Sequence, residues 1–288
     1  MKPTIMALSL FLLFLHSYTF GYYPESEQKS PTNDTYNTSV DTRPLAATRL
    51  AGATDNDTTA RTGIYIPLYS YPTSSEWIQA AVIKQLFPKI PFLSCINPSD
   101  GPGSHFDENF ATGIDSLSKA GILVGGYVAT HYGQKPQSEV EKEITAYKTW
   151  YHRINGICFD EMQSKAGKEY YYKYLTEFSK SLGLNFTAGN PGTDVSPTYI
   201  GTVDYLKIYE GSGTPALSTL QGWHLKYDKK NFITIAYNVP HVNYTYLAEA
   251  TKYVGLLYIT DDFLPNPYDT LPNYLFNVIR FLNSTYGD

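Results

Sequence analysis

The sequence predicts an α/β fold, a single (β/α)8 TIM barrel over residues 62–288. Short apolar or β-branched runs recur eight times from Gly63 onward, segments with helical periodicity separate most of them, and polar side chains gather where the runs end. Strands that alternate with helices every 25 to 35 residues or so are typical of βαβ units in a parallel sheet. Eight such units favour a closed barrel over an open doubly wound sheet.

The expected strands share β-branched or apolar residues and end near polar or aromatic ones: 63–69, 91–97, 121–130, 156–161, 184–190, 203–210, 231–238 and 255–262. The expected helices share an apolar period near four residues: 75–87, 110–120, 138–153, 168–182, 214–227, 244–253 and 272–286. Only the segment GTDVSPTYIGT separates the fifth and sixth strands. We therefore expect a short helix there, or none.

The N-terminal residues predict export, to a secreted or cell-surface location. Residues 1–22 hold one lysine and then an apolar run over 5–15, which is typical of a signal peptide or an N-terminal anchor. Residues 23–61 are rich in Ser, Thr, Asn, Asp and Pro and predict a disordered polar linker. Glycosylation sequons occur at Asn33, Asn37, Asn56, Asn185, Asn243 and Asn283. Asn185 is expected on a buried strand, where a glycan could not attach. We therefore expect a glycoprotein whose glycans are carried by the polar tail, residues 23–61.

The composition excludes several classes of partner. A net charge of -5 argues against nucleic acid and anionic membranes. No GxGxxG follows a strand and no GxxxxGK[ST] occurs, so we expect no nucleotide. Without CxxC, HExxH or clustered histidines, we expect no metal and no other cofactor. Cys95 and Cys158 lie within expected strands and predict buried free thiols. We also expect the protein to be a monomer.

Acidic residues end two of the expected strands. Asp160 and Glu161 end the fourth, and Glu210 ends the sixth. Alternation places Cys158 below Asp160 and puts Asp204, Leu206, Ile208 and Glu210 on one side of the sixth strand. Strands of equal parity share an interior layer, so Asp160 and Glu210 should face each other across the barrel mouth. Two such carboxyls suit glycoside cleavage, although each acid alone also fits a solvated loop.

Other polar and aromatic residues should line the same opening. Aromatic rings suited to stacking on sugars are expected at Tyr69, Tyr127, Tyr132 and Tyr237, among the 27 tyrosines of the chain. Hydrogen-bonding side chains are expected at Asn97, His131, Asn190 and Asn238. Ordinary packing and turn chemistry remain open as explanations for each of them, since Gly or Pro follows several of these positions.

Five motifs carry a resemblance to a known family. The segments GIYIPLYSYP, INPSDGPG, AGILVGGYVATHYG, INGICFDE and GNPGT, in this order, resemble the spherulin-4 family over nearly all of the chain from Gly63 onward. The resemblance implies a (β/α)8 fold and a secreted or cell-surface glycoside hydrolase that acts on α-1,4-linked polymers of galactosamine or N-acetylgalactosamine. It also implies that Asp160, Glu161 and Glu210 form the functional set.

The combined expectation is an endo-acting glycosidase whose partner is an extracellular amino-sugar polysaccharide. Glu210 is expected to be the proton donor with a raised pKa, Asp160 the nucleophile or base, and Glu161 a group that holds the sugar or orients Asp160. A non-catalytic polysaccharide-binding protein of a spore coat or matrix is the alternative, since it needs the aromatic rim but no catalytic acids. A carbohydrate deacetylase is a weaker one, because no His-Asp metal cluster is evident.

Overall fold

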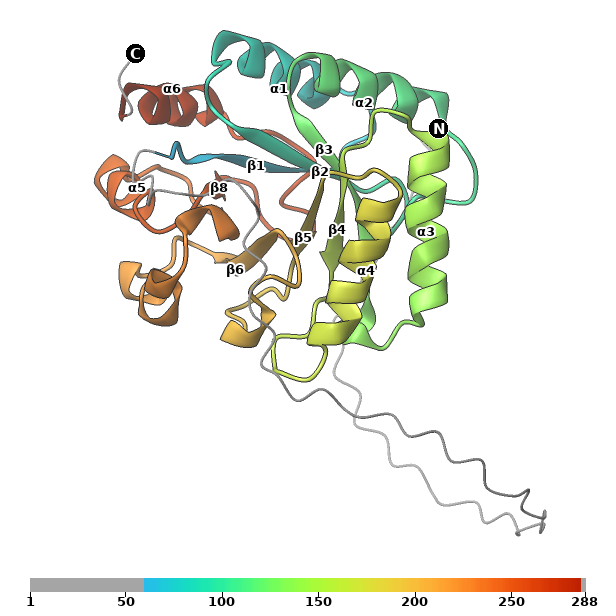
Figure 1. The fold of residues 1–288 in the computed structure, drawn as a ribbon. Coiled ribbons are helices and arrows are strands. Elements are labelled where there is room, and N and C mark those ends of the chain that lie inside the picture. The colour runs from blue at the N-terminus through green and yellow to red at the C-terminus, as the bar shows by residue number, and fades with distance from the viewer. Residues whose placement is uncertain (1–59, 286–288) are drawn as a thin grey trace, which may run out of the picture. The chain divides into compact units, whose positions relative to one another are not determined.

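The computed structural model describes residues 60–285 and contains a closed barrel of eight parallel strands (Figure 1). Each strand pairs with the next, and β8 pairs back with β1 through Gly63 opposite Leu256. The strands are β1 (Gly63–Leu68), β2 (Phe92–Ile96), β3 (Leu123–Ala129), β4 (Gly156–Asp160), β5 (Phe186–Gly189), β6 (Tyr205–Ser212), β7 (Phe232–Tyr237) and β8 (Leu256–Ile259). The expected (β/α)8 fold is confirmed. The expected leader (1–22) lies outside the described residues, as does the expected linker (23–61) except for its last two positions.

Helices connect most of the strands and surround the barrel (Figure 1). They are α1 (Ser75–Leu86), α2 (Glu108–Lys119), α3 (Gln137–Trp150), α4 (Glu169–Ser181), α5 (Tyr244–Ala250) and α6 (Leu275–Thr285). After β5 only the 3-10 turn η2 (Pro197–Tyr199) forms, as expected. The expected helix 214–227 is wrong. Two 3-10 turns, η3 (Leu217–Leu220) and η4 (Gly222–Lys226), replace it, because Gly222 at the start of η4 has a φ of 82° that no α-helix accepts.

Side chains alternate between the barrel interior and the helix layer. On β4, Phe159 packs against Tyr172 of α4, while Cys158 lies inside, where the hydroxyl of Tyr65 donates to its sulfur at 3.6 Å. Gly126 on β3 lets the ring of Tyr147 from α3 lie against the strand, since a Cβ there would be 2.6 Å from that ring. This alternation puts the side chain at the end of β4, Asp160, into the barrel mouth.

Strand β6 departs from regular alternation. Lys207 pairs with Ile233 and Tyr209 with Thr234, so Ile208 is an extra residue without a partner on β7. Such a bulge shifts every following side chain by one position. The expected common side for Asp204 through Glu210 is therefore wrong, and Asp204 instead accepts hydrogen bonds from Thr187 and Lys180 on the outer side of the barrel.

Two smaller expectations concern the described residues. Cys95 and Cys158 are free and buried, as expected. Asn185 is exposed and precedes β5, so its expected burial is wrong. Within residues 60–285, no helix combines the length and the apolar character needed to cross a membrane. The sequons at Asn33, Asn37 and Asn56 lie outside the described residues.

Candidate active site

A single amide joins the two acids at the mouth of the barrel. Asn190, directly after β5, donates through Nδ2 to Asp160 Oδ1 and to Glu210 Oε2, each at 2.6 Å. The two acceptor oxygens are therefore no farther apart than about 5.2 Å, twice that distance. The Glu210 side chain is 18% exposed and Asp160 is half-buried, so neither acid is sealed from solvent. The structure thus brings together three residues from three consecutive strands.

Two further groups hold Glu210. The hydroxyl of Tyr268, in the segment between β8 and α6, donates to Glu210 Oε1. The ammonium of Lys207 lies 3.7 Å from Glu210 Oε2 and 4.8 Å from the centre of the Tyr65 ring beneath it. The Lys207 side chain is only 4% exposed, so its nitrogen lies deep in the barrel beside the acids.

The electrostatics differ between the groups. Burial raises the pKa of Asp160; Lys207 opposes this effect and Glu210 adds to it, with a net rise. Burial by itself lowers the pKa of Lys207, but the Glu210 and Asp160 carboxylates outweigh it and the pKa is raised. Of the two acids that Asn190 joins, Asp160 is thus the one whose raised pKa has a physical cause in its surroundings.

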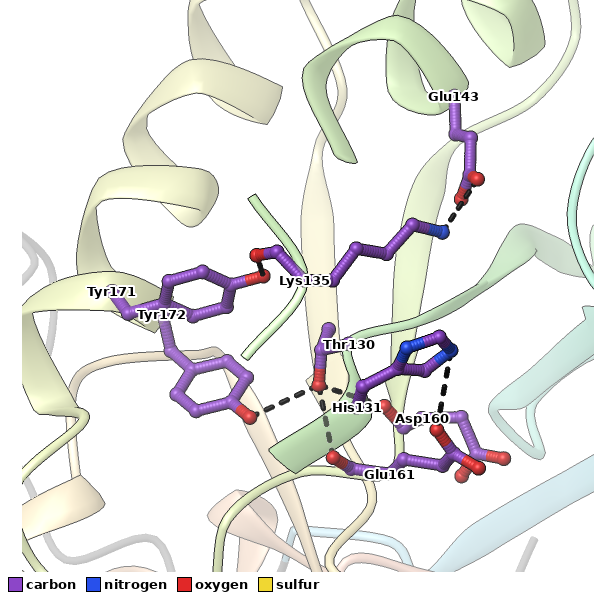
Figure 2. A network of polar contacts seen from close by, with 8 residues as sticks. All are labelled: Thr130, His131, Lys135, Glu143, Asp160, Glu161, Tyr171 and Tyr172. Atoms are coloured by element: carbon purple, nitrogen blue, oxygen red, sulfur yellow. Dashed lines mark hydrogen bonds and ion pairs between the residues drawn. The ribbon is translucent and has the colours of Figure 1, made fainter. Parts of the chain in front are cut away.

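Residues directly after β3 form hydrogen bonds with the backbone that carries Asp160 and Glu161 (Figure 2). Thr130 Oγ1 contacts the Asp160 and Glu161 carbonyl oxygens at 2.9 and 3.0 Å, and the Tyr132 N–H donates to the Glu161 carbonyl at 2.6 Å. Tyr172 from α4 contacts Thr130 Oγ1 at 3.0 Å. These contacts hold Glu161 at a φ of 49°, an uncommon left-handed conformation for a glutamate.

The Glu161 side chain points toward His131 at the rim. Their Oε2 and Nε2 atoms are 3.7 Å apart, and both side chains are well exposed (Figure 2). His131 and Tyr132 also have left-handed φ values, 49° and 57°. Left-handed backbone of this kind is costly for ordinary residues and tends to gather at functional sites. Lys135, just beyond, bonds to Glu143 of α3 at 2.5 Å and ties this loop to the helix layer.

Tyrosines line the interior below and beside the acids. The Tyr127 hydroxyl faces the Asp160 carboxyl and lowers its pKa, against the larger effect of burial. Tyr69 packs its ring edge-on against Tyr127 and Tyr268, with centroids 6.0 and 5.5 Å away. Tyr237 at the end of β7 is half-buried, and Tyr132 is exposed. Tyr127 and Tyr69 thus support the acids from the interior, while Tyr132 alone of these four rings is well exposed.

The remaining expected binding residues, Asn97 and Asn238, form hydrogen bonds with the loops and strand ends around them. Asn97 Oδ1 accepts from the Gly101 N–H at 3.1 Å, which is turn chemistry within the loop after β2. Asn238, with a φ of 56°, donates to Ser212 Oγ at 3.0 Å and links the ends of β6 and β7. Both residues lie at strand ends on the mouth side, but neither forms a hydrogen bond with Asp160 or Glu210.

Sequence reasoning missed Lys207 and Tyr268. A lysine between Leu206 and Ile208, in a largely apolar segment, is a signal for a buried charge. Regular alternation, however, predicts that the Lys207 side chain points away from the barrel interior. Tyr268 follows β8 within a long irregular segment, where no periodic pattern predicts which way a side chain points. Among residues 60–285, no group of three or more His, Cys, Asp or Glu side chains is arranged to hold a metal ion.

The fold and the site define a closed (β/α)8 barrel with a pair of carboxyls at its mouth. A sequence model of the family described as spherulation-specific family 4 matches residues 63–282, and the chain belongs to this family. The chain is 28% identical over 228 residues to Spherulin-4 of Physarum polycephalum, covering 74% of this chain and 67% of that protein.

Solved structures share the barrel. The crystal structure of Aspergillus clavatus Sph3 in complex with GalNAc matches with a TM-score of 0.68 and 23% identity, over 79% of this chain and 99% of that one. The catalytic domain of a mannanase from Streptomyces sp. SirexAA-E matches with a TM-score of 0.51 and 12% identity, over 80% of this chain and 87% of that one. At these identities the likeness concerns the fold.

Proposed function

We propose that this protein is a secreted or cell-surface glycoside hydrolase that cleaves α-1,4-linked polysaccharide containing galactosamine or N-acetylgalactosamine. The observation that carries the proposal is the pair Asp160 and Glu210, held on one Asn190 amide at the open end of the barrel. Glycoside cleavage needs one carboxyl to protonate the leaving oxygen and a second carboxylate on the other side of the bond. The substrate class is supported by family membership and by the amino sugar bound to the related Sph3.

The spacing of the two acids favours retention of configuration. Retaining enzymes hold their carboxyls about 5–5.5 Å apart, and inverting enzymes hold them about 6.5–9.5 Å apart to admit a water. The upper limit of about 5.2 Å between the two oxygens bound to Asn190 fits the first class. In that mechanism one acid protonates the glycosidic oxygen as the C–O bond breaks, the other attacks the anomeric carbon, and water then releases the covalent sugar.

The test is release of reducing sugar from galactosamine-containing polymers. Asp160→Asn and Glu210→Gln should each lose nearly all turnover, whereas Asp115→Asn, which removes an exposed carboxylate on α2, should keep it. NMR of the first-formed product should show the anomeric configuration of the substrate. Azide rescue then assigns the two roles, since a variant lacking the nucleophile gives a glycosyl azide of inverted configuration and a variant lacking the acid gives the retained one. Unchanged turnover in both acid variants removes them from the mechanism.

A binding protein without turnover is the second candidate. The exposed rings of Tyr71 and Tyr132, 47% and 48% accessible, favour it because they suit stacking on a glycan. Affinity for the polymer with no product from the wild type selects this candidate. Loss of affinity in Tyr132→Ala with the fold retained then identifies the ring that binds.

A further inference from the structure

The buried ammonium of Lys207 has no role in the scheme above, yet its charge acts on both acids. It comes from the first half of β6, and among residues 60–285 the carboxylate oxygen within ion-pair distance of it is Glu210 Oε2, at 3.7 Å. That distance is longer than a good ionic hydrogen bond, so Lys207 acts on Glu210 mainly through its charge. In a buried environment such a charge is little screened and reaches the second acid as well.

The bulge in β6 is what brings this charge inward. In a regular strand, residues three apart face opposite sides, so Lys207 and Glu210 would point away from each other. Because Ile208 is an extra residue, both side chains point into the barrel. Bulges are often found where a strand re-aims a side chain next to an active site.

Within residues 60–285, the formal charges that act on Lys207 come from Glu210 and Asp160. The titratable groups that face it are Tyr65 from β1, Cys95 from β2, Cys158 and Asp160 from β4, and Glu210 from β6. The acids are also faced by the neutral hydroxyls of Tyr127 and Tyr268 and by the ring of Tyr69. One ammonium therefore stands against two carboxyls in the interior.

We propose that Lys207 is a positioning residue for the acid pair, whose charge holds one carboxylate ionised beside a protonated partner. One ammonium, one carboxylate and one neutral carboxyl sum to zero charge, which is the least costly combination in a buried site. This is also the protonation state that acid and nucleophile need before they act together. The inference rests on the proposed function for its consequence in catalysis, but its electrostatic part stands on the geometry alone.

Lys207→Met removes the charge and keeps most of the side-chain volume. Both limbs of the pH profile of kcat/KM should move to higher pH by about one unit or more, because the carboxyls lose their cation. Lys207→Arg should leave the limbs near their wild-type positions. The matched control is Lys84→Met, which removes another buried ammonium, one bonded to the Pro88 and Ile90 carbonyl oxygens away from the site. It should not move the limbs.

Carbon-13 NMR of the Asp160 and Glu210 carboxyls measures the same effect without turnover. Both titrations should shift upward in Lys207→Met, even if the wild type cleaves no polysaccharide. In the wild type, the Lys207 side-chain nitrogen should remain an ammonium throughout the active pH range, which tests the proposal if the methionine variant does not fold. Carboxyl titrations that are unchanged in Lys207→Met, or a neutral Lys207 amine at pH 7, overturn it.

Discussion

The backbone N–H of Gly192 donates to Oδ1 of Asn190 at 3.0 Å, and this contact decides which end of the Asn190 amide faces the acids. With the oxygen occupied, the NH2 group must point toward Asp160 and Glu210. An amide carries no charge at any working pH, so it can join two acids whatever their protonation.

Asn190→Asp should therefore destabilise the protein more at pH 7 than at pH 5. A third carboxyl beside two acids is held neutral in the fold, so its stabilising contribution is present at low pH and lost as pH rises. Thermal unfolding at both pH values checks this. Asn190→Ala removes the amide without adding charge and should lower stability by about 1.5–3 kcal/mol at either pH. Equal losses for both variants at both pH values contradict the account.

Asp160→Asn should stabilise the fold at neutral pH. The pKa of Asp160 is raised, so the folded chain binds that proton more tightly than the unfolded chain does. Its contribution to stability is complete below the unfolded value and is lost as pH rises through the folded one. At pH 7 the amide should gain on the order of 1 kcal/mol, or about 2–4 °C in Tm, and below about pH 4 the gain should vanish.

Asp115→Asn is the control for that experiment. The Lys119 hydrogen bond lowers the pKa of Asp115, with burial opposing and Arg153 assisting, so ionisation of this exposed carboxyl favours the fold. Its amide variant should show no gain in Tm at pH 7. A Tm for Asp160→Asn below that of the wild type at pH 7 shows that the carboxyl is stabilised there as an anion.

Tyr268→Phe removes the hydroxyl that contacts Glu210 and nothing else. Loss of a hydrogen bond to a charged group, worth about 1.5–3 kcal/mol, should reduce kcat/KM by about tenfold or more. Tyr174→Phe removes a similar tyrosine–glutamate bond, 2.6 Å to Glu141, between α3 and α4, and should leave kcat/KM unchanged. The proposed hydrolase assay measures both, and equal rates for the two variants show that Tyr268 only fills space.

Thr130→Val replaces the hydroxyl beneath the Asp160–Glu161 backbone with a methyl group. The Asp160 and Glu161 carbonyls and the Tyr172 hydroxyl each lose a partner, so the free energy of unfolding should fall by about 1–3 kcal/mol. Urea unfolding measures the change. Thr145→Val, on the exposed face of α3, is the control and should change it by less than about 0.5 kcal/mol.

The sequence predicted the fold and the placement of Asp160 because both depend on local regularity. Strand β4 alternates without interruption, so Cys158 and Asp160 share the interior side as expected. Lys207 could not be placed, since a bulge is a property of pairing with β7 and does not show in the order of residues. Tyr268 is 58 positions from Glu210 and follows β8 without any periodic pattern, so only the folded chain reveals the contact.

The unpartnered Ile208 in β6 has a consequence for changes in chain length. Deleting this one isoleucine restores a simple two-residue rhythm, and it leaves every acid, amide and cation of the mouth in the sequence. The lysine and the glutamate are then two residues apart in a regular strand and still share the interior side. Homologues that lack the extra position are expected to keep a lysine two residues before the glutamate, whereas a regular pairing that retained the isoleucine would turn the two charges to opposite sides.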